Sequence, residues 1–189
     1  MTFFLVDPLD GTKEFVGRNG EFTVNIALMR NRIPTLGVIV APVMGWVFAG
    51  ELAMGAWRAE IGDPRVSHQM TNKRRISTRP APETIDVCTS RSHYTVEAEN
   101  FLNRFEIGEK KPIGSSLKFC LLAAGEADLY PRFSPTMEWD TAAGNAILSA
   151  AGGIVVSQDG NPLQYGKQHH SDKPFKNPGF IAMGDKNLK

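Results

Sequence analysis

Hydrophobic residues alternate with less hydrophobic ones along residues 22–29, where every second position carries Phe, Val, Ile or Leu. A period of two is typical of a strand with one face more deeply buried than the other. Shorter apolar runs predict further strands at 3–6, 36–40, 46–48 and 56–59. The first part of the chain is therefore expected to form an antiparallel meander.

The rhythm changes after residues 63–83, a polar stretch with three prolines that is typical of a linker or long loop. The pattern then predicts helices at 95–105, 115–124 and 138–151, and strands at 85–88, 129–130, 154–156 and 180–183. We expect a serine to cap the second helix, and Gly152-Gly153 to stop the third. Alternating strands and helices indicate a layered α/β arrangement.

The first predicted helix is expected to turn its apolar side chains inward, namely Val96, Phe101, Leu102 and Phe105. The two patterns divide the chain into a strand-rich subdomain at 1–82 and an α/β subdomain at 83–189. Residues 33–50 carry no charge, but Pro34, Pro42 and two glycines divide them into strand-sized pieces. We therefore predict a β-hairpin there and no membrane-spanning segment.

Composition narrows the possible partners. The 189 residues are 42% hydrophobic and carry a formal net charge of +1, as in an ordinary soluble globular protein. Such a balance provides no field to hold a nucleic acid polymer or an anionic membrane, so an anionic ligand must be bound locally. Cys88 and Cys120 form no metal or disulfide pattern, which suits a reducing cytoplasm.

The candidate chemistry begins in the segment Phe4-Leu5-Val6-Asp7-Pro8-Leu9-Asp10-Gly11-Thr12. It predicts a buried strand that delivers two carboxylates, Asp7 and Asp10, into a tight turn. Mg²⁺ prefers oxygen ligands, which these side chains and the Leu9 carbonyl can supply. If Gly11 and Thr12 open a helical turn, their amides can donate to a phosphate oxygen. The same pattern also fits an ordinary turn with solvated carboxylates.

Asp140 is the third candidate ligand, at the start of the Ala-rich helix. An acidic residue in a first helical turn is also favoured by the helix dipole alone. Phosphatases that form an aspartyl-phosphate place their paired aspartates two residues apart, whereas Asp7 and Asp10 are separated by three. The spacing therefore favours a site where metal ions polarise the phosphoryl group and activate water.

Several motifs in order resemble the inositol monophosphatase superfamily of Mg²⁺-dependent, lithium-sensitive phosphatases. The acidic segment and Trp139-Asp140-Thr141-Ala142-Ala143-Gly144 match its two signatures. Four further stretches narrow the resemblance to the bacterial 3′(2′),5′-bisphosphate nucleotidases of the CysQ type. These stretches are residues 11–15, residues 19–28, Ser90-Arg91-Ser92-His93 and Gly114-Ser115-Ser116-Leu117-Lys118-Phe119-Cys120. The resemblance implies an α+β fold, a layered αβαβα sandwich.

The resemblance also implies a reaction, the hydrolysis of 3′-phosphoadenosine 5′-phosphate to AMP and phosphate in the cytoplasm, with peripheral attachment to the inner membrane left open. Two or three Mg²⁺ ions occupy the complete family site. The implied metal ligands are Asp7, the Leu9 carbonyl, Asp10 and Asp140. Thr12 is expected to orient the attacking water together with Asp10. The implied nucleotide contacts are Gly11, Thr12, Ser90, His93, Gly114, Lys118 and Asp140.

Plainer roles stay open for some of these residues: Ser90 as a helix cap, His93 beside a helix start, and Lys118 as a solvated helix residue. Tyr130, Arg132 and Phe133 precede the Asp140 helix and are further candidates for lining a pocket.

Length is where the chain departs from the family. Family members carry helices ahead of the acidic turn, including an Asp and a Glu of the site, whereas Met1 stands six residues before Asp7. We therefore expect the N-terminal helical layer to be missing, turnover to be weak or absent, and the uncovered sheet to self-associate as a dimer or larger species. The alternatives are a non-catalytic module that binds nucleotide or metal, and a sugar phosphatase of the inositol monophosphatase kind.

Overall fold

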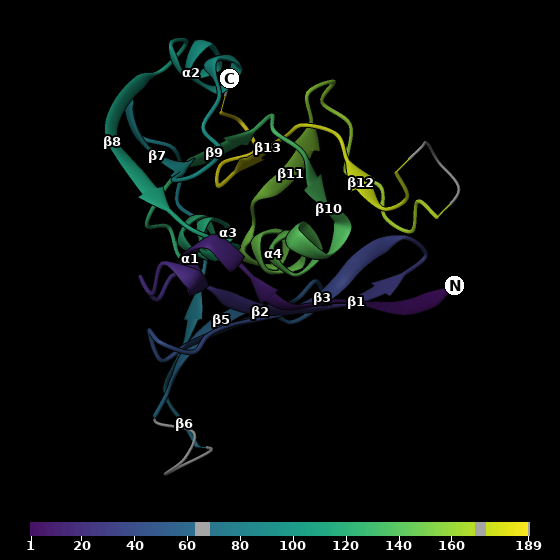
Figure 1. Ribbon diagram of the computed structural model, residues 1–189. Helices are drawn as coiled ribbons and strands as arrows, with labels where there is room; N and C mark the ends of the chain where they lie inside the picture. The colour runs from purple at the N-terminus through teal and green to yellow at the C-terminus, as the bar shows by residue number, and fades with distance from the viewer. Residues whose placement is uncertain (63–68, 169–172, 189) are drawn as a thin grey trace.

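A computed structural model describes residues 1–62, 69–168 and 173–188. Its first sheet contains six strands in chain order, each antiparallel to the next (Figure 1). The strands are β1 (Thr2–Asp10), β2 (Thr23–Arg30), β3 (Ile33–Ala41), β4 (Trp46–Glu51), β5 (Gly55–Ile61) and β6 (Met70–Ile76). The antiparallel meander predicted from the alternating pattern is confirmed.

The second sheet is mixed, with the order β11-β13-β9-β7-β8. β7 and β8 are parallel, as are β7 and β9, whereas β13 runs antiparallel to both of its neighbours. Its strands are β7 (Thr84–Ser90), β8 (Glu106–Ile113), β9 (Leu129–Arg132), β11 (Ile154–Ser157) and β13 (Phe180–Met183). Two short strands, β10 (Thr136–Met137) and β12 (Lys176–Asn177), pair beside it.

Helices separate the two sheets. α3 (Leu117–Ala123) and α4 (Glu138–Ala151) lie between them, and α2 (Val96–Leu102) lies beyond the second sheet (Figure 1). α4 packs on β1 to β5 on one side and contacts β11 on the other. From the first sheet outward the layers are therefore sheet, helices, sheet and helix, which agrees with the α+β sandwich expected from the sequence.

Close packing holds α4 against the first sheet. A Cβ on Gly37 of β3 would lie 2.3 Å from the carbonyl oxygen of Ala143, so only glycine allows this approach. Beneath the second sheet, Phe119, Tyr130 and Phe180 form an aromatic cluster with ring centroids 5.4 to 5.6 Å apart. This core fixes the first turn of α4, which carries Asp140, relative to β1.

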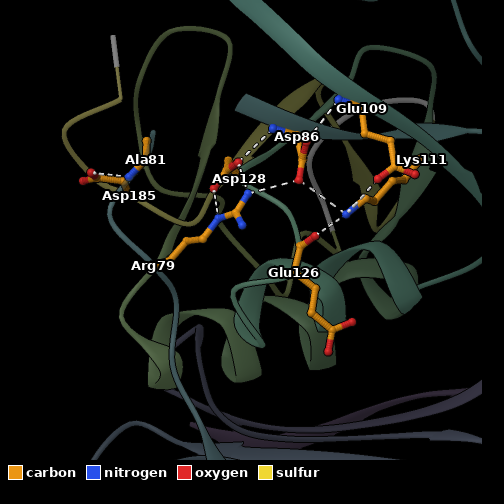
Figure 2. A network of polar contacts seen from close by, with 8 residues as sticks. All are labelled: Arg79, Ala81, Asp86, Glu109, Lys111, Glu126, Asp128 and Asp185. Atoms are coloured by element: carbon orange, nitrogen blue, oxygen red, sulfur yellow. Dashed lines mark hydrogen bonds and ion pairs between the residues drawn. The ribbon is translucent and has the colours of Figure 1, made fainter. Parts of the chain in front are cut away.

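The segment that joins the two sheets is held by a polar network (Figure 2). Arg79 donates from Nε and Nη2 to the two carboxylate oxygens of Asp128, at 2.7 Å each, and from Nη2 to Asp86 at 3.2 Å. Lys111 reaches Asp86 from β8 at 3.5 Å, and the N–H of Ala81 donates to Asp185 at 3.0 Å. Charged side chains therefore anchor this connection to the second sheet.

Four strands were not predicted: β6, β8 and the two-residue strands β10 and β12. The sequence favoured a linker at 63–83, but β6 lies within it and pairs with β5; residues 63–68 lie outside the described residues. β8 falls in a stretch where the sequence suggested no element. Most side chains of β6 and β8 are exposed and polar, so backbone pairing stabilises them without leaving an apolar pattern.

The helix predictions were accurate for α4, whose bounds match and whose end at Gly152 has the left-handed conformation. They were too long for α2, which begins after Thr95 and ends at Leu102. Val96 was expected inside but is 73% exposed, because it opens the helix on the solvent side. Ser116 occupies the N-cap position of α3, but its side chain accepts no cap hydrogen bond, and its hydroxyl donates to Asp10 of the acidic segment instead.

The hairpin predicted at residues 33–50 is confirmed, since β3 and β4 pair in antiparallel fashion. Within the part of the chain that the structure describes, no helix is long and apolar enough to cross a membrane. Cys88 and Cys120 are buried free thiols, as expected. The subdomain boundary between residues 82 and 83 stays a prediction.

Candidate active site

β1 carries the two aspartates of the acidic segment. The sequence predicted a turn from Asp7 onward, but the strand continues to Asp10 and its pairing with β2 shifts register between these residues. The N–H of Leu9 donates to Asp7 Oδ1 at 3.0 Å across the irregularity. Gly11 then takes a left-handed conformation, with φ of 88°, and α1 (Thr12–Val16) starts directly after it. The segment therefore opens a helical turn at Thr12, which is the arrangement expected to let the Gly11 and Thr12 amides donate to a phosphate.

Asp140 reaches the same place from the second half of the chain. It lies in the first turn of α4, where its Oδ2 accepts a hydrogen bond from the N–H of Met137 at 2.7 Å. One carboxylate oxygen from each of Asp7, Asp10 and Asp140 can be chosen so that all lie within 4.8 Å of one another. The three aspartates named from the sequence therefore converge.

Burial and the repulsion between the three carboxylates disfavour their ionised forms. Burial, followed by the charges of Asp10 and Asp7, raises the pKa of Asp140 to about 7, against the opposing effect of the Met137 N–H. Burial also raises the pKa of Asp7, and the N–H of Leu9 opposes that shift. Carboxylates that resist ionisation together favour a bound cation that neutralises them.

Asp10 is held in place by residues of β2 and by the N-cap residue of α3. Ser116 donates to Asp10 Oδ2 from its N–H at 2.7 Å and from its hydroxyl at 2.5 Å. Asn25 Nδ2 and Thr23 Oγ1 donate to the same oxygen, at 3.2 and 3.3 Å. Among the described residues these contacts all fall on Oδ2, which leaves Oδ1 for a further ligand.

A cavity of about 310 Å³ opens beside the cluster. Its size suits a small polar molecule. It is lined by Asp10, Gly11, Thr12, Lys13, Glu14, Ser90, His93, Gly114, Ser115, Lys118, Phe119, Tyr130, Arg132, Pro135, Thr136, Asp140, Thr141 and Phe180. Carboxylates therefore meet basic side chains across one small space.

The basic side of the cavity is built around Arg132. Its Nη1 donates to Ser90 Oγ at 2.9 Å, and that hydroxyl also accepts the N–H of His93 at 3.2 Å. Burial lowers the pKa of His93, and the positive charges of Arg132 and Lys13 lower it further. The imidazole is thus kept neutral near pH 7 and can both donate and accept hydrogen bonds.

Lys118 lies at the floor of the cavity. It is buried, and burial lowers the pKa of its ammonium group to about 8. Nζ donates to the carbonyl oxygens of Ile113 at 3.0 Å and Ser115 at 2.6 Å. The lysine thereby supports the loop beside the acidic segment as well as placing a positive charge under the cavity.

Most of the residues named from the sequence line this cavity, with two exceptions: Asp7 joins through the carboxylate cluster, and Leu9 lies outside the lining residues that the structure describes. Of the three open candidates, Tyr130 and Arg132 line it, whereas Phe133 borders a separate shallow cavity.

The sequence patterns did not point to the residues that hold Asp10 in place. Asn25 is buried on the same face of β2 as Ala27 and Met29, whereas the more apolar Ile26 is on the more exposed face, so the alternation gave no signal that Asn25 is buried. Ser116 left no signal in the sequence either, because its contact with Asp10 joins segments 106 residues apart.

Comparison with curated proteins identifies relatives of this chain. The 3′(2′),5′-bisphosphate nucleotidase CysQ of Escherichia coli K12 is 47% identical over 178 residues, which cover 94% of this chain and 66% of the relative. The protein of that name in Buchnera aphidicola is 44% identical over 96% of this chain and 64% of its own length. The chain thus spans about two thirds of the length of these curated relatives.

Solved structures show the same fold. CysQ from Bacteroides thetaiotaomicron superposes with a TM-score of 0.82 at 40% identity, covering 97% of this chain and 70% of that one. An inositol monophosphatase from Zymomonas mobilis gives 0.76 at 25% identity, covering 99% and 67%. The model of the inositol monophosphatase family matches residues 1–176. This chain therefore belongs to the inositol monophosphatase family.

Proposed function

We propose that this chain carries the site of a Mg²⁺-dependent phosphatase that removes the 3′-phosphate of 3′-phosphoadenosine 5′-phosphate, giving AMP and phosphate. The observation that carries the proposal is the juxtaposition of three aspartates with a basic cavity wall. The names of the relatives from Escherichia coli and Buchnera support the choice of a nucleoside bisphosphate. We further propose a cytoplasmic location, which suits two free thiols.

The residues present fit a divalent cation. All donors of the cluster are carboxylate oxygens, the hard ligands that Mg²⁺ prefers. Burial, and then the charges of Asp10 and Asp7, raise the pKa of Asp140, and a bound cation would offset both effects. Asp7, Asp10 and Asp140 would hold the metal, together with the Leu9 carbonyl. When bound, Mg²⁺ neutralises charge on the phosphoryl group and makes a coordinated water more acidic.

The protein's own groups bind and orient the substrate in this proposal. Thr12 and Asp10 hold the attacking water in line with the phosphorus atom. The N–H groups of Gly11 and Thr12 donate to the phosphate that is cleaved. The second phosphate lies toward Arg132 and Lys118, whose positive charges balance it.

The remaining contacts lie on the nucleoside side. Ser90, His93 and Gly114 line the cavity there and contact the sugar and base in this proposal. The neutral His93 ring offers a flat surface and two hydrogen-bonding nitrogens to that part of the ligand.

A phosphate-release assay tests the proposal. We expect at most weak release from 3′-phosphoadenosine 5′-phosphate with Mg²⁺, none with chelator, and inhibition of any release by Li⁺. Preference for inositol monophosphate or fructose 1,6-bisphosphate would instead support the sugar-phosphatase alternative. Calorimetry separates an inactive chain that still binds Mg²⁺ and nucleotide, the non-catalytic alternative, from one that binds neither.

Asp140→Asn and Asp159→Asn form a matched pair for this assay. Asp159 is exposed in the turn after β11, outside the cavity lining, so its variant should behave as the wild type. Asp140→Asn should reduce Mg²⁺ affinity and turnover together. Equal behaviour of the two variants would contradict the assignment of the metal site.

A further inference from the structure

Two loops of the second sheet meet the acidic segment beside the cavity. Residues 91–93 follow β7 and residues 114–116 follow β8, and the two strands pair in parallel with Ser90 opposite Ile113. Because neighbouring parallel strands end at the same edge of a sheet, both loops leave that edge side by side. Glu14 of α1 and Glu21, which precedes β2, contact these loops from the connection between β1 and β2.

One carboxylate joins both loops. Arg91 donates to Glu21 from Nη2 at 2.7 Å and from Nε at 3.2 Å, and the N–H of Gly114 donates to the same carboxylate at 2.7 Å. Arg91 Nη2 also donates to the carbonyl oxygen of Pro112 at 2.7 Å. A two-point pair between arginine and a carboxylate fixes orientation as well as distance. We call Glu21, Arg91 and Gly114 the Glu21 clasp.

Glu14 adds a second contact to the same two loops. Its buried side chain accepts a hydrogen bond from Ser92 Oγ at 3.3 Å. A Cβ on Gly114 would lie 2.5 Å from Glu14 Cγ, so this loop reaches the acidic segment only with glycine at that position. Two carboxylates of the connection between β1 and β2 therefore hold the loops beside the acidic segment.

We propose that the Glu21 clasp is a positioning device, which sets the distance between the nucleotide-contacting loops and the aspartates. This inference rests on the proposed function, which assigns Ser90 and His93 to the nucleotide. Glu21 and Arg91 lie outside the described lining of the cavity, so they act through the loops that they hold. A displacement of these loops moves the bound nucleotide relative to the aspartates, which is costly when the geometry must be accurate.

Variants of the clasp test this role. Arg91→Met removes the pair, Arg91→Lys keeps the charge, and Glu21→Gln keeps an acceptor for the Gly114 N–H. Arg75→Met is the matched control, because Arg75 on β6 is exposed and donates to the Met54 carbonyl at 2.9 Å, away from the cavity lining. Hydrogen exchange is measured on the ligand-free proteins, and calorimetry with Mg²⁺ present gives the affinities for 3′-phosphoadenosine 5′-phosphate and inorganic phosphate.

We expect Arg91→Met to speed exchange of the Gly114 N–H by about tenfold. The Kd for the nucleotide should rise about fivefold more than the Kd for inorganic phosphate, since the nucleotide alone spans the loops and the aspartates. Arg91→Lys and Glu21→Gln should give smaller changes, and Arg75→Met none.

Unchanged exchange in Arg91→Met, or equal losses for both ligands, would overturn the positioning role. If the wild type binds no nucleotide, the proposed function fails. The exchange result then still decides whether the clasp holds the loops.

Discussion

At the scale of single residues, the site depends on side chains that touch no substrate. Ser116 is the clearest case, since its N–H and hydroxyl both donate to Asp10 Oδ2 while the hydroxyl lies 3.0 Å from the carbonyl oxygen of Asp140. One serine thus links two of the three aspartates. Groups that orient metal ligands commonly alter affinity nearly as much as the ligands themselves.

We therefore predict that Ser116→Ala weakens Mg²⁺ binding about tenfold, because Asp10 loses a hydrogen bond that fixes its carboxylate. Calorimetric titration with Mg²⁺ measures the change. Ser149→Ala is the matched control: its hydroxyl donates to Asn145 Oδ1 at 3.1 Å near the far end of α4. The idea fails if both variants bind Mg²⁺ as the wild type does.

The raised pKa of Asp140 predicts that the stability of the metal-free protein depends on pH. Burial and the neighbouring carboxylates raise its pKa to about 7, so the folded state holds a proton that the unfolded chain releases at lower pH. The stability that this proton provides is present in acid and is lost as the pH rises from about 4 to about 7. At pH 8 the buried charge therefore destabilises the fold.

Asp140→Asn removes that charge and keeps an acceptor for the Met137 N–H. In chelator at pH 8 we expect the variant to be more stable than the wild type by on the order of 2 kcal/mol, and by less at pH 5. Urea unfolding at both pH values measures the difference. A difference of the same size at both would show that Asp140 ionises normally.

At the scale of elements, the sequence located the strands and helices whose apolar residues recur in a regular pattern. The alternation located β2 correctly, although its more apolar residues, such as Ile26, lie on the more exposed face of the strand. The apolar run closed by Gly152 located α4, most of which is buried. β6 and β8 were missed because their exposed side chains carry no such pattern. Backbone pairing with a neighbouring strand, which has no local signature, stabilises them.

The same division applies to the site. Asp7, Asp10 and Asp140 could be named because their spacing and neighbours form motifs, and the structure brings their carboxylates together. No role in the site could be given to Asn25 and Ser116, because their contacts with Asp10 depend on where β2 and α3 meet the end of β1. Local motifs identified the candidate ligands, whereas tertiary packing supplies the groups that hold them.

The network of Figure 2 yields a prediction at this scale. The Asp128 side chain is 1% exposed and accepts hydrogen bonds from Arg79 and from the N–H of Asp86 at 2.8 Å. Asp128→Asn removes the negative charge beside Arg79 and replaces one of the two acceptor oxygens by an NH₂ group that faces donors, so we expect a loss of about 2 kcal/mol in the free energy of unfolding.

Urea unfolding measures that loss, and Asp159→Asn provides an exposed control for the same chemical change. Arg79 is partly solvated, which keeps the expected loss below that of a fully buried pair. Two variants of equal stability would mean that water replaces Asp128 as the partner of Arg79.

At the scale of the whole molecule, the first sheet has two unlike faces. Alternate residues of β1 and β2, such as Leu5 and Ala27, pack in the core with α4, while the residues between them point away from it. On that outer face Phe4 is 63% exposed, Val6 48% and Ile26 39%. A groove of about 500 Å³, lined by residues of β3 to β6 that include Leu36, Val38 and Trp57, lies on the same sheet.

We predict that a second copy of this chain covers the outer face, giving a dimer or larger species, because exposed apolar surface of this extent favours association. Val6 and Ile26 are opposite one another across β1 and β2, so Ile26→Lys places a charge in the middle of the patch. Sedimentation velocity should show association in the wild type and dissociation to monomers in Ile26→Lys. The Lys110→Met variant, which changes an exposed residue of the second sheet, should associate as the wild type does. A wild type that stays monomeric at every concentration would contradict the prediction, and the apolar face would then be tolerated in water.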